Sequence, residues 1–88
     1  MTECEILTAA IEKYGEKAQE EVAIEEMSEL IQAICHKHRG REHNIAEEIA
    51  DVEIMLEQLK IINGCRNKVL LIKAAKILRL EKRLKGNE

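Results

Sequence analysis

Residues 23–34 read AIEEMSELIQAI and residues 45–56 read IAEEIADVEIML, and these two stretches decide the fold. In each, apolar residues recur three or four positions apart, which is the spacing of one face of an α-helix rather than the alternation of a strand. The chain has 88 residues with no proline, phenylalanine or tryptophan, a composition that favours long uninterrupted helices. We therefore expect one all-α domain spanning residues 1–88.

Glycines about 25 residues apart separate four segments of helical apolar spacing, and these are Gly15, Gly40, Gly64 and Gly86. We predict four helices, near residues 2–14, 17–38, 43–62 and 66–85. Thr2 with Glu5 three residues later predicts a capping box on the first helix, and Asn44 is the predicted cap of the third.

The apolar stripes predict how these helices pack. The second and third helices each carry one stripe, and we expect the two stripes to bury against each other: Ala23, Met27, Leu30, Ile31 and Ile34 on one, and Ile45, Ile49, Val52, Met55, Leu56 and Leu59 on the other. The fourth helix carries two stripes, one with Leu70, Ala74, Ile77, Leu80 and Leu84, and one with Leu71, Ala75 and Leu78. We expect one stripe to join the core and the other to contact a partner chain, which makes a homo-oligomer through the C-terminal helix.

Charge and cysteine content exclude several classes of protein. The formal net charge is −3, with acidic and basic residues interspersed through most of the chain, so we expect no binding of a nucleic acid duplex. No apolar run approaches the roughly 20 residues that cross a bilayer, and we expect no membrane partner. The three cysteines form no CxxC pair, which is typical of reduced thiols in a cytoplasmic protein.

Two short acidic motifs carry the candidate chemistry. Residues 25–29 read EEMSE and residues 47–51 read EEIAD. Residues three apart lie on the same side of a helix, so each motif presents a pair of carboxylates in one direction, Glu26 with Glu29 and Glu48 with Asp51. The midpoint between the motifs falls beside Gly40, where the turn between antiparallel helices is expected, so the two pairs should lie level with each other.

Glu48 falls inside the apolar arc of its helix, between Val52 and Met55, with Asp51 at the edge of the arc. An ionised carboxylate buried without a partner costs several kcal/mol, and four that converge also repel one another. A cation is therefore required between them. Oxygen ligands without histidine or cysteine suit Mg²⁺, or Mn²⁺, rather than zinc. The alternative is that both motifs are solvated helix faces, which is the usual state of a single such motif.

At these residues the chain resembles the MazG-like all-α nucleotide pyrophosphohydrolases, whose pattern is ExxE on one helix and ExxD on the next. The resemblance covers most of residues 14–62. It implies a four-helix MazG-like bundle, assembled as a homodimer or a dimer of dimers. It also implies Mg²⁺-dependent hydrolysis of a nucleoside triphosphate to the monophosphate and pyrophosphate.

The residue chemistry agrees with that activity. Mg²⁺ held by Glu26, Glu29, Glu48 and Asp51 would bridge phosphate oxygens and lower the pKa of an attacking water. Glu25 and Glu47 are candidate catalytic residues that orient or deprotonate this water, the alternative being that they are simply exposed. Lys73, close to the core-facing stripe of the fourth helix, is the candidate substrate-binding residue for the phosphates, although a lysine there also suits an ordinary solvated helix.

Three other functions stay open. A di-iron or di-manganese bundle would gather similar carboxylates but requires Glu-x-x-His motifs, and neither acidic motif contains one. Phosphoribosyl-ATP pyrophosphatase is related in fold and acidic motifs and acts on a different substrate. A non-enzymatic helical dimer that serves as an interaction module would leave the acidic motifs exposed.

Overall fold

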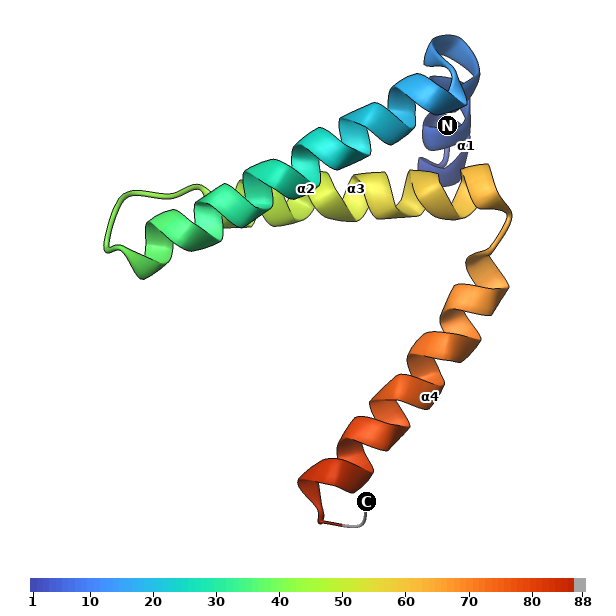
Figure 1. Cartoon of the computed structure of the whole chain (residues 1–88). Coiled ribbons are helices and arrows are strands. Elements are labelled where there is room, and N and C mark those ends of the chain that lie inside the picture. Colours follow the sequence, from blue (N-terminus) through green and yellow to red (C-terminus); the bar gives the residue numbers. More distant parts are fainter. Residues whose placement is uncertain (87–88) are drawn as a thin grey trace.

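The computed structural model describes residues 1–86, and it is built of four α-helices (Figure 1). They are α1 (Glu3–Tyr14), α2 (Glu16–His38), α3 (Ile45–Asn63) and α4 (Arg66–Leu84), and no strand occurs among the described residues. The all-α prediction is confirmed, and every predicted helix end lies within two residues of the observed one. None of the helices is long and apolar enough to cross a membrane.

The predicted cap of α1 is confirmed, whereas the predicted cap of α3 is wrong in its chemistry. The Thr2 side chain accepts from the Glu5 backbone N–H at 3.1 Å, and the Glu5 carboxylate accepts from the Thr2 N–H at 3.0 Å. Asn44 occupies the N-cap position of α3 without capping it. Its side-chain Nδ2 donates to Glu48 Oε1 at 2.8 Å, and this hydrogen bond orients the side chain so that Oδ1 caps no backbone N–H.

α2 and α3 pack along their length as an antiparallel pair, and α1 crosses one end of this pair (Figure 1). Small residues of α2 allow the helices to approach closely, since Ala23 and Ala33 are almost fully buried. The rest of the apolar core comes from all three helices, namely Leu7, Ile11, Val52 and Met55. The body of the molecule is therefore residues 1–63, held mainly by one helix pair.

Part of the predicted α2–α3 packing is wrong. Ile31 is 62% exposed, and Ile49 and Leu56 are each more than 40% exposed. Two helices bury only the side chains along their line of contact, and a closed bundle would need a fourth helix to cover the flanks. That helix is absent from the flank in a single chain.

α4 projects away from the body (Figure 1). It contacts α3 near the turn at Gly64, which takes a left-handed conformation (φ 58°), and it makes no contact with α2 among the described residues. None of its residues is buried. The chain thus contains the four expected helices, but α4 lies outside the core of its own chain.

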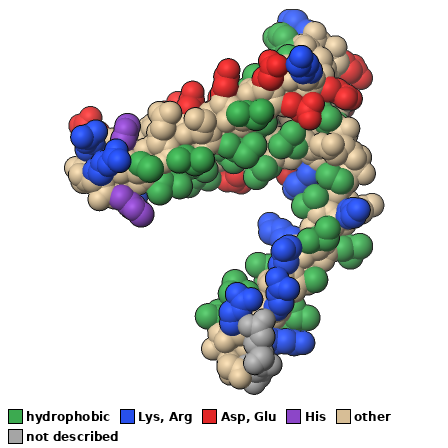
Figure 2. Space-filling view, viewed as in Figure 1, with side chains coloured by type: hydrophobic (Ala, Val, Ile, Leu, Met, Phe, Trp, Pro, Cys, Tyr) green, Lys and Arg blue, Asp and Glu red, His purple; other side chains and the backbone are tan. Residues whose placement is uncertain are grey.

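Charge divides the chain at the same point. Residues 1–65 contain fifteen Asp and Glu against six Lys and Arg, whereas residues 66–88 contain two against eight. The expected mixing of charges therefore does not extend to α4. Figure 2 shows basic and hydrophobic side chains side by side along this helix.

Candidate metal centre between two helices

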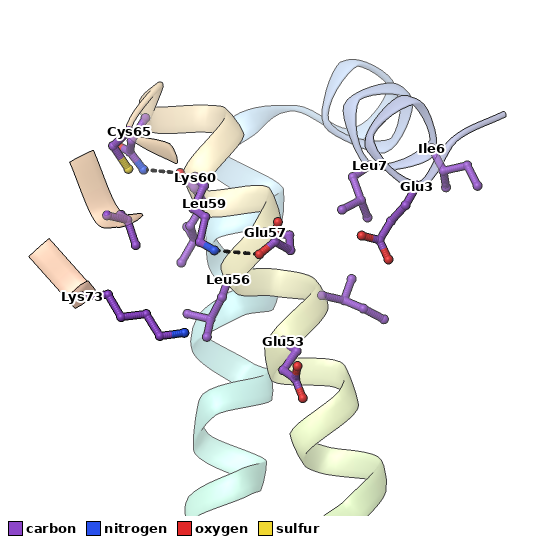
Figure 3. Close-up of a pocket in the computed structure, with 13 residues that line it drawn as sticks. Glu3, Ile6, Leu7, Glu53, Leu56, Glu57, Leu59, Lys60, Cys65 and Lys73 are labelled. Atoms are coloured by element: carbon purple, nitrogen blue, oxygen red, sulfur yellow. Dashed lines mark hydrogen bonds and ion pairs between the residues drawn. The ribbon is translucent and has the colours of Figure 1, made fainter. Parts of the chain in front are cut away.

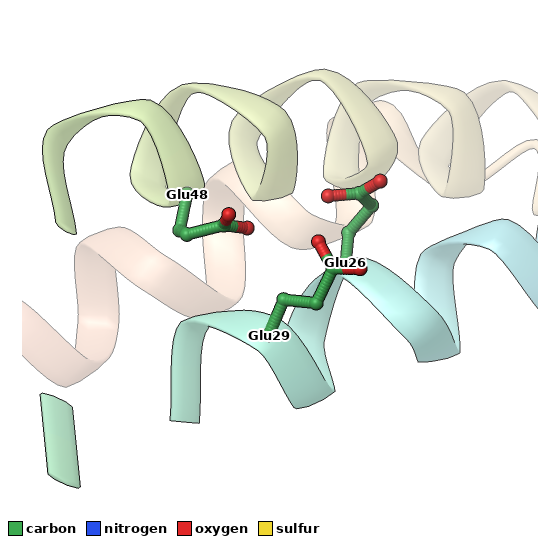
Figure 4. Close-up of side chains that lie close together, drawn as sticks. All are labelled: Glu26, Glu29 and Glu48. Carbon is green, nitrogen blue, oxygen red and sulfur yellow. The ribbon is translucent and has the colours of Figure 1, made fainter. Parts of the chain in front are cut away.

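Three of the four predicted metal ligands converge between α2 and α3. Glu26, Glu29 and Glu48 each offer a carboxylate oxygen, and these oxygens lie within 4.8 Å of one another. Glu26 and Glu29 come from one helix and Glu48 from the other, and all three point into the space between them (Figure 4). The antiparallel register inferred from the motif spacing is what brings the pairs level.

Asp51, the fourth predicted ligand, lies beside this group and outside its closest part. It is half-buried, and its charge acts on both Glu26 and Glu48. We name the four residues Glu26, Glu29, Glu48 and Asp51 the carboxylate cluster.

The cluster contains carboxylate oxygens that are buried and lack a hydrogen-bond partner. Glu48 is only 7% exposed, as its place within the apolar arc predicted. Its Oε1 accepts from Asn44, but its Oε2 has no partner, and neither does Oε2 of Glu26. Buried polar atoms are nearly always hydrogen-bonded in folded proteins, so two such oxygens make this gap a candidate site for a cation.

The pKa values of the cluster reflect the same environment. Burial raises the pKa of Glu26 above its ordinary value, and the charges of Glu29, Asp51 and Glu48 raise it further. Burial also raises the pKa of Glu48, partly opposed by the Asn44 hydrogen bond and reinforced by the charges of Glu29 and Asp51. Both shifts arise because ionised carboxylates are crowded together away from water.

Glu25 and Glu47, the candidate catalytic residues, are exposed and stand one residue before the cluster on each helix. Neither belongs to the close group of carboxylate oxygens. One residue corresponds to a rotation of about 100° around a helix, which turns both side chains toward solvent at the edge of the cluster.

Lys73, the candidate substrate-binding residue, lies elsewhere in the chain. It lines a groove formed by α1, α3 and the beginning of α4, and none of the four cluster carboxylates lines that groove (Figure 3). The expectation that Lys73 faces a cleft with the carboxylates is therefore wrong for a single chain. The physical reason is that α4 does not fold back against α2.

Two buried amides went unnoticed in the sequence. Gln19 of α2 and Gln58 of α3 are 9% and 4% exposed, and Oε1 of Gln58 has no hydrogen-bond partner. Gln58 stands seven residues after Asp51 and three after Met55, and thus on the same helix face. That periodicity is the signal by which the sequence could have revealed it.

Comparisons with the models of known protein families, with curated proteins and with solved structures found no match to this chain.

Proposed function

We propose that this protein is a Mg²⁺-dependent nucleoside-triphosphate pyrophosphohydrolase of the MazG-like kind, which forms a nucleoside monophosphate and pyrophosphate. One observation carries the proposal. Glu26, Glu29 and Glu48 converge from two helices, and two of their buried oxygens have no partner. The ExxE and ExxD motifs that place them are those on which the resemblance rests.

The donor set fits a hard divalent cation. Three carboxylates lie close together, with Asp51 beside them, and no histidine or cysteine takes part in the group. Mg²⁺ prefers such oxygen ligands and commonly completes its coordination with water and substrate phosphates, and Mn²⁺ accepts the same ligands. A cation would also remove the repulsion that raises the pKa values of Glu26 and Glu48.

The protein's own residues would divide the work as follows. The carboxylate cluster holds the metal, which when bound supplies charge neutralisation at the phosphate oxygens and a more acidic water. Asn44 fixes the orientation of Glu48 through its hydrogen bond at 2.8 Å. Glu25 and Glu47 are exposed at the edge of the cluster, where a carboxylate can accept a proton from an attacking water.

Binding of the triphosphate would require cationic side chains from outside the carboxylate cluster. In one chain, Lys73 is in a different groove. A cation for the phosphates would then come from a second chain, in a homodimer or a dimer of dimers that associates through α4. The abundance of exposed apolar side chains on α4 supports this assembly.

A substrate panel tests the function. The purified protein would be incubated with canonical and modified (d)NTPs and with phosphoribosyl-ATP, with and without Mg²⁺, and pyrophosphate and orthophosphate would be assayed separately. We expect Mg²⁺-dependent release of pyrophosphate from at least one nucleoside triphosphate. Cleavage of phosphoribosyl-ATP alone would reassign the substrate. Orthophosphate as the first product, or no release from any compound, would overturn the proposal and favour a non-enzymatic helical module.

A further inference from the structure

α4 is a helix without a core to pack on. Its large apolar side chains are strongly exposed, with Leu71 at 72%, Leu70 at 64% and Ile77 at 57%. A helix of 19 residues that buries none of its side chains is only marginally stable in water, because most helical stability comes from burial of an apolar face. A surface that covers α4 is therefore expected.

The side chains of α4 sort into two arcs around the helix axis. At 100° per residue, eight of the ten apolar residues fall in one broad arc of about 200°. This apolar arc holds Val69, Leu70, Leu71, Ala74, Ile77, Leu78, Leu80 and Leu84, with Arg66, Lys73 and Glu81 within it. The opposite, basic arc holds Lys68, Lys76, Arg79, Lys82 and Arg83, together with Ile72 and Ala75. An apolar arc this wide has room for two neighbours, and the basic arc forbids burial on all sides.

The body of the molecule offers a groove that suits such a helix. A groove of about 1100 Å³ lies in the elbow between α1, α3 and the first turns of α4 (Figure 3). We name it the elbow groove. Its walls include apolar side chains that the chain itself leaves exposed, Ile6 at 51%, Ile54 at 47% and Leu56 at 42%.

Acidic side chains border the elbow groove. Glu57 accepts from Lys60 and from Arg66, at 2.7 Å in each case. Glu3 and Glu53 also line the groove and form no ion pair within residues 1–86. The groove therefore combines an apolar floor with carboxylates that are free to meet cations.

The same chain cannot fill its own elbow groove, because its α4 already forms one wall with Cys65, Val69 and Lys73. We propose that α4 of a second copy of this chain occupies the elbow groove, and that the exchange is reciprocal about a two-fold axis. The apolar arc of the incoming helix would then contact the floor of the groove on one side and the resident α4 on the other. Its flanking cations would meet the acidic border.

Charge selects this arrangement over two helices that pair only with each other. Each α4 carries seven Lys and Arg against one Glu, so an isolated α4–α4 pair would bring like charges together. Docking on residues 1–65 instead places a cationic helix against a region with nine more acidic than basic residues. A reciprocal contact of this kind closes as a dimer and does not propagate.

The oligomeric state of point variants tests the elbow groove. Ile54→Asp places a charge on the groove floor, and Ile24→Asp places one on α2 outside the groove, where the side chain is 66% exposed. Multi-angle light scattering at several protein concentrations should give a dimer mass for the parent chain and Ile24→Asp. Ile54→Asp should dissociate at concentrations at least about tenfold higher, with unchanged helix content by circular dichroism. A monomeric parent chain, or equal dimer masses for all three proteins, would overturn the proposal.

Cross-linking locates the contact. In chains whose three cysteines are replaced by serine, Glu53→Cys would be introduced into one tagged population and Leu80→Cys into another. A short bismaleimide should join the two differently tagged chains. Cross-links only between Leu80→Cys chains would show α4–α4 pairing instead and would overturn the groove assignment. Binding of duplex DNA by α4 of a monomeric chain would overturn it as well. None of these experiments contains Mg²⁺ or nucleotide. Their failure would remove the second chain as the source of a cation for the phosphates, and the substrate panel would still test the hydrolase activity separately.

Discussion

α3 and α4 are both 19 residues long and similarly apolar, with eleven and ten aliphatic residues or methionine, yet only α3 buries any of them. The difference lies in the neighbours available to each helix. α3 lies antiparallel to α2, whose small Ala23 and Ala33 bring the two backbones close, whereas α4 leaves the body at Gly64. Apolar content therefore indicates that a helix must be buried against another surface. Whether that surface belongs to the same chain depends on which helices lie beside it.

α3 and α4 also differ in how their charged side chains are distributed. On α3, Glu48 is buried within an apolar arc and faces Glu26 and Glu29, so the carboxylates are concentrated at one site. On α4, five of the seven Lys and Arg are spread along one exposed arc. The first arrangement suits a small ion, and the second suits a broad surface.

Removal of one cluster charge should have the largest effect. Glu48→Gln keeps the shape of the side chain but replaces one charged oxygen by an amide, so we expect Mg²⁺-dependent turnover to fall by at least about 100-fold, since even residues that only orient a metal ligand cost 10–100-fold. Pyrophosphate release at saturating Mg²⁺ measures it. Glu20→Gln, an exposed change on α2, is the matched control and should keep its activity. Full activity in Glu48→Gln would exclude Glu48 from the site.

Mg²⁺ should stabilise the body and leave α4 unaffected. At a concentration 100 times Kd, an ion that binds only the folded state adds about 2.7 kcal/mol. Hydrogen exchange with and without Mg²⁺ should therefore show slower exchange in α2 and α3 near the carboxylate cluster. Amides of α4 are the internal control, and Glu48→Gln should lose the response. Equal protection of α4 would show that Mg²⁺ binding in the body is coupled to α4.

Ala23 of α2 and Ala75 of α4 allow the packing of the two helices to be compared directly. Ala23 is 1% exposed at the α2–α3 contact, whereas Ala75 of α4 is exposed. Ala23→Leu forces extra volume between two backbones and should cost about 1–3 kcal/mol of unfolding free energy. Ala75→Leu should change it by less than about 0.5 kcal/mol. Chemical denaturation measures both, and similar values would mean that Ala75 is packed as tightly as Ala23.

The sequence allowed the helices and the carboxylate cluster to be predicted because both depend on local periodicity. Glu48 could be recognised as buried because Val52 and Met55 share its helix face. The side-by-side position of the two acidic motifs followed from the turn at Gly40. The location of Lys73 could not be predicted. It depends on the direction in which α4 leaves Gly64, and periodicity within a helix carries no information about that direction.

Two smaller errors have the same origin. The sequence indicates Asn44 as the residue before α3, but whether its Oδ1 caps a backbone N–H depends on the orientation of the side chain, which the hydrogen bond from its Nδ2 to Glu48 sets. Ile31 and Ile49 belong to apolar stripes, but a stripe does not show which of its edges lies on the line of contact. Pairwise packing is a property of two helices and is not encoded in either one alone.

Acidification should distinguish the cluster from the rest of the surface in the metal-free chain. The folded-state pKa values of Glu26 and Glu48 are raised above 4.5, so the folded chain binds more protons than the unfolded chain between 4.5 and the raised values. Stability therefore falls as the pH rises through this window. We expect Tm to increase as the pH is lowered from 7 to 5.

The controls for this experiment follow from the same pKa shifts. In the double variant Glu26→Gln, Glu48→Gln, Tm should barely change between pH 7 and 5. Below pH 4.5 the trend should reverse, because hydrogen bonds hold the pKa values of Glu5 and Glu57 below their usual value and that stabilisation is lost on protonation. A metal-free Tm that falls steadily from pH 7 to 5 would contradict the crowding of Glu26 and Glu48.

The smallest expected effect concerns the N-terminal caps of the first and last helices. α1 begins with the capping box of Thr2 and Glu5, whereas Cys65, the N-cap residue of α4, provides no side-chain cap. Thr2→Ala removes an acceptor for the Glu5 backbone N–H and should lower the unfolding free energy by about 1 kcal/mol, because α1 packs on the body through Leu7 and Ile11. Ser28→Ala, an exposed change within α2, is the control and should be neutral or slightly stabilising, since alanine has the higher helix propensity. If Thr2→Ala left the denaturation midpoint unchanged, α1 would be frayed at its start, and the stable body would be reduced to the α2–α3 pair alone.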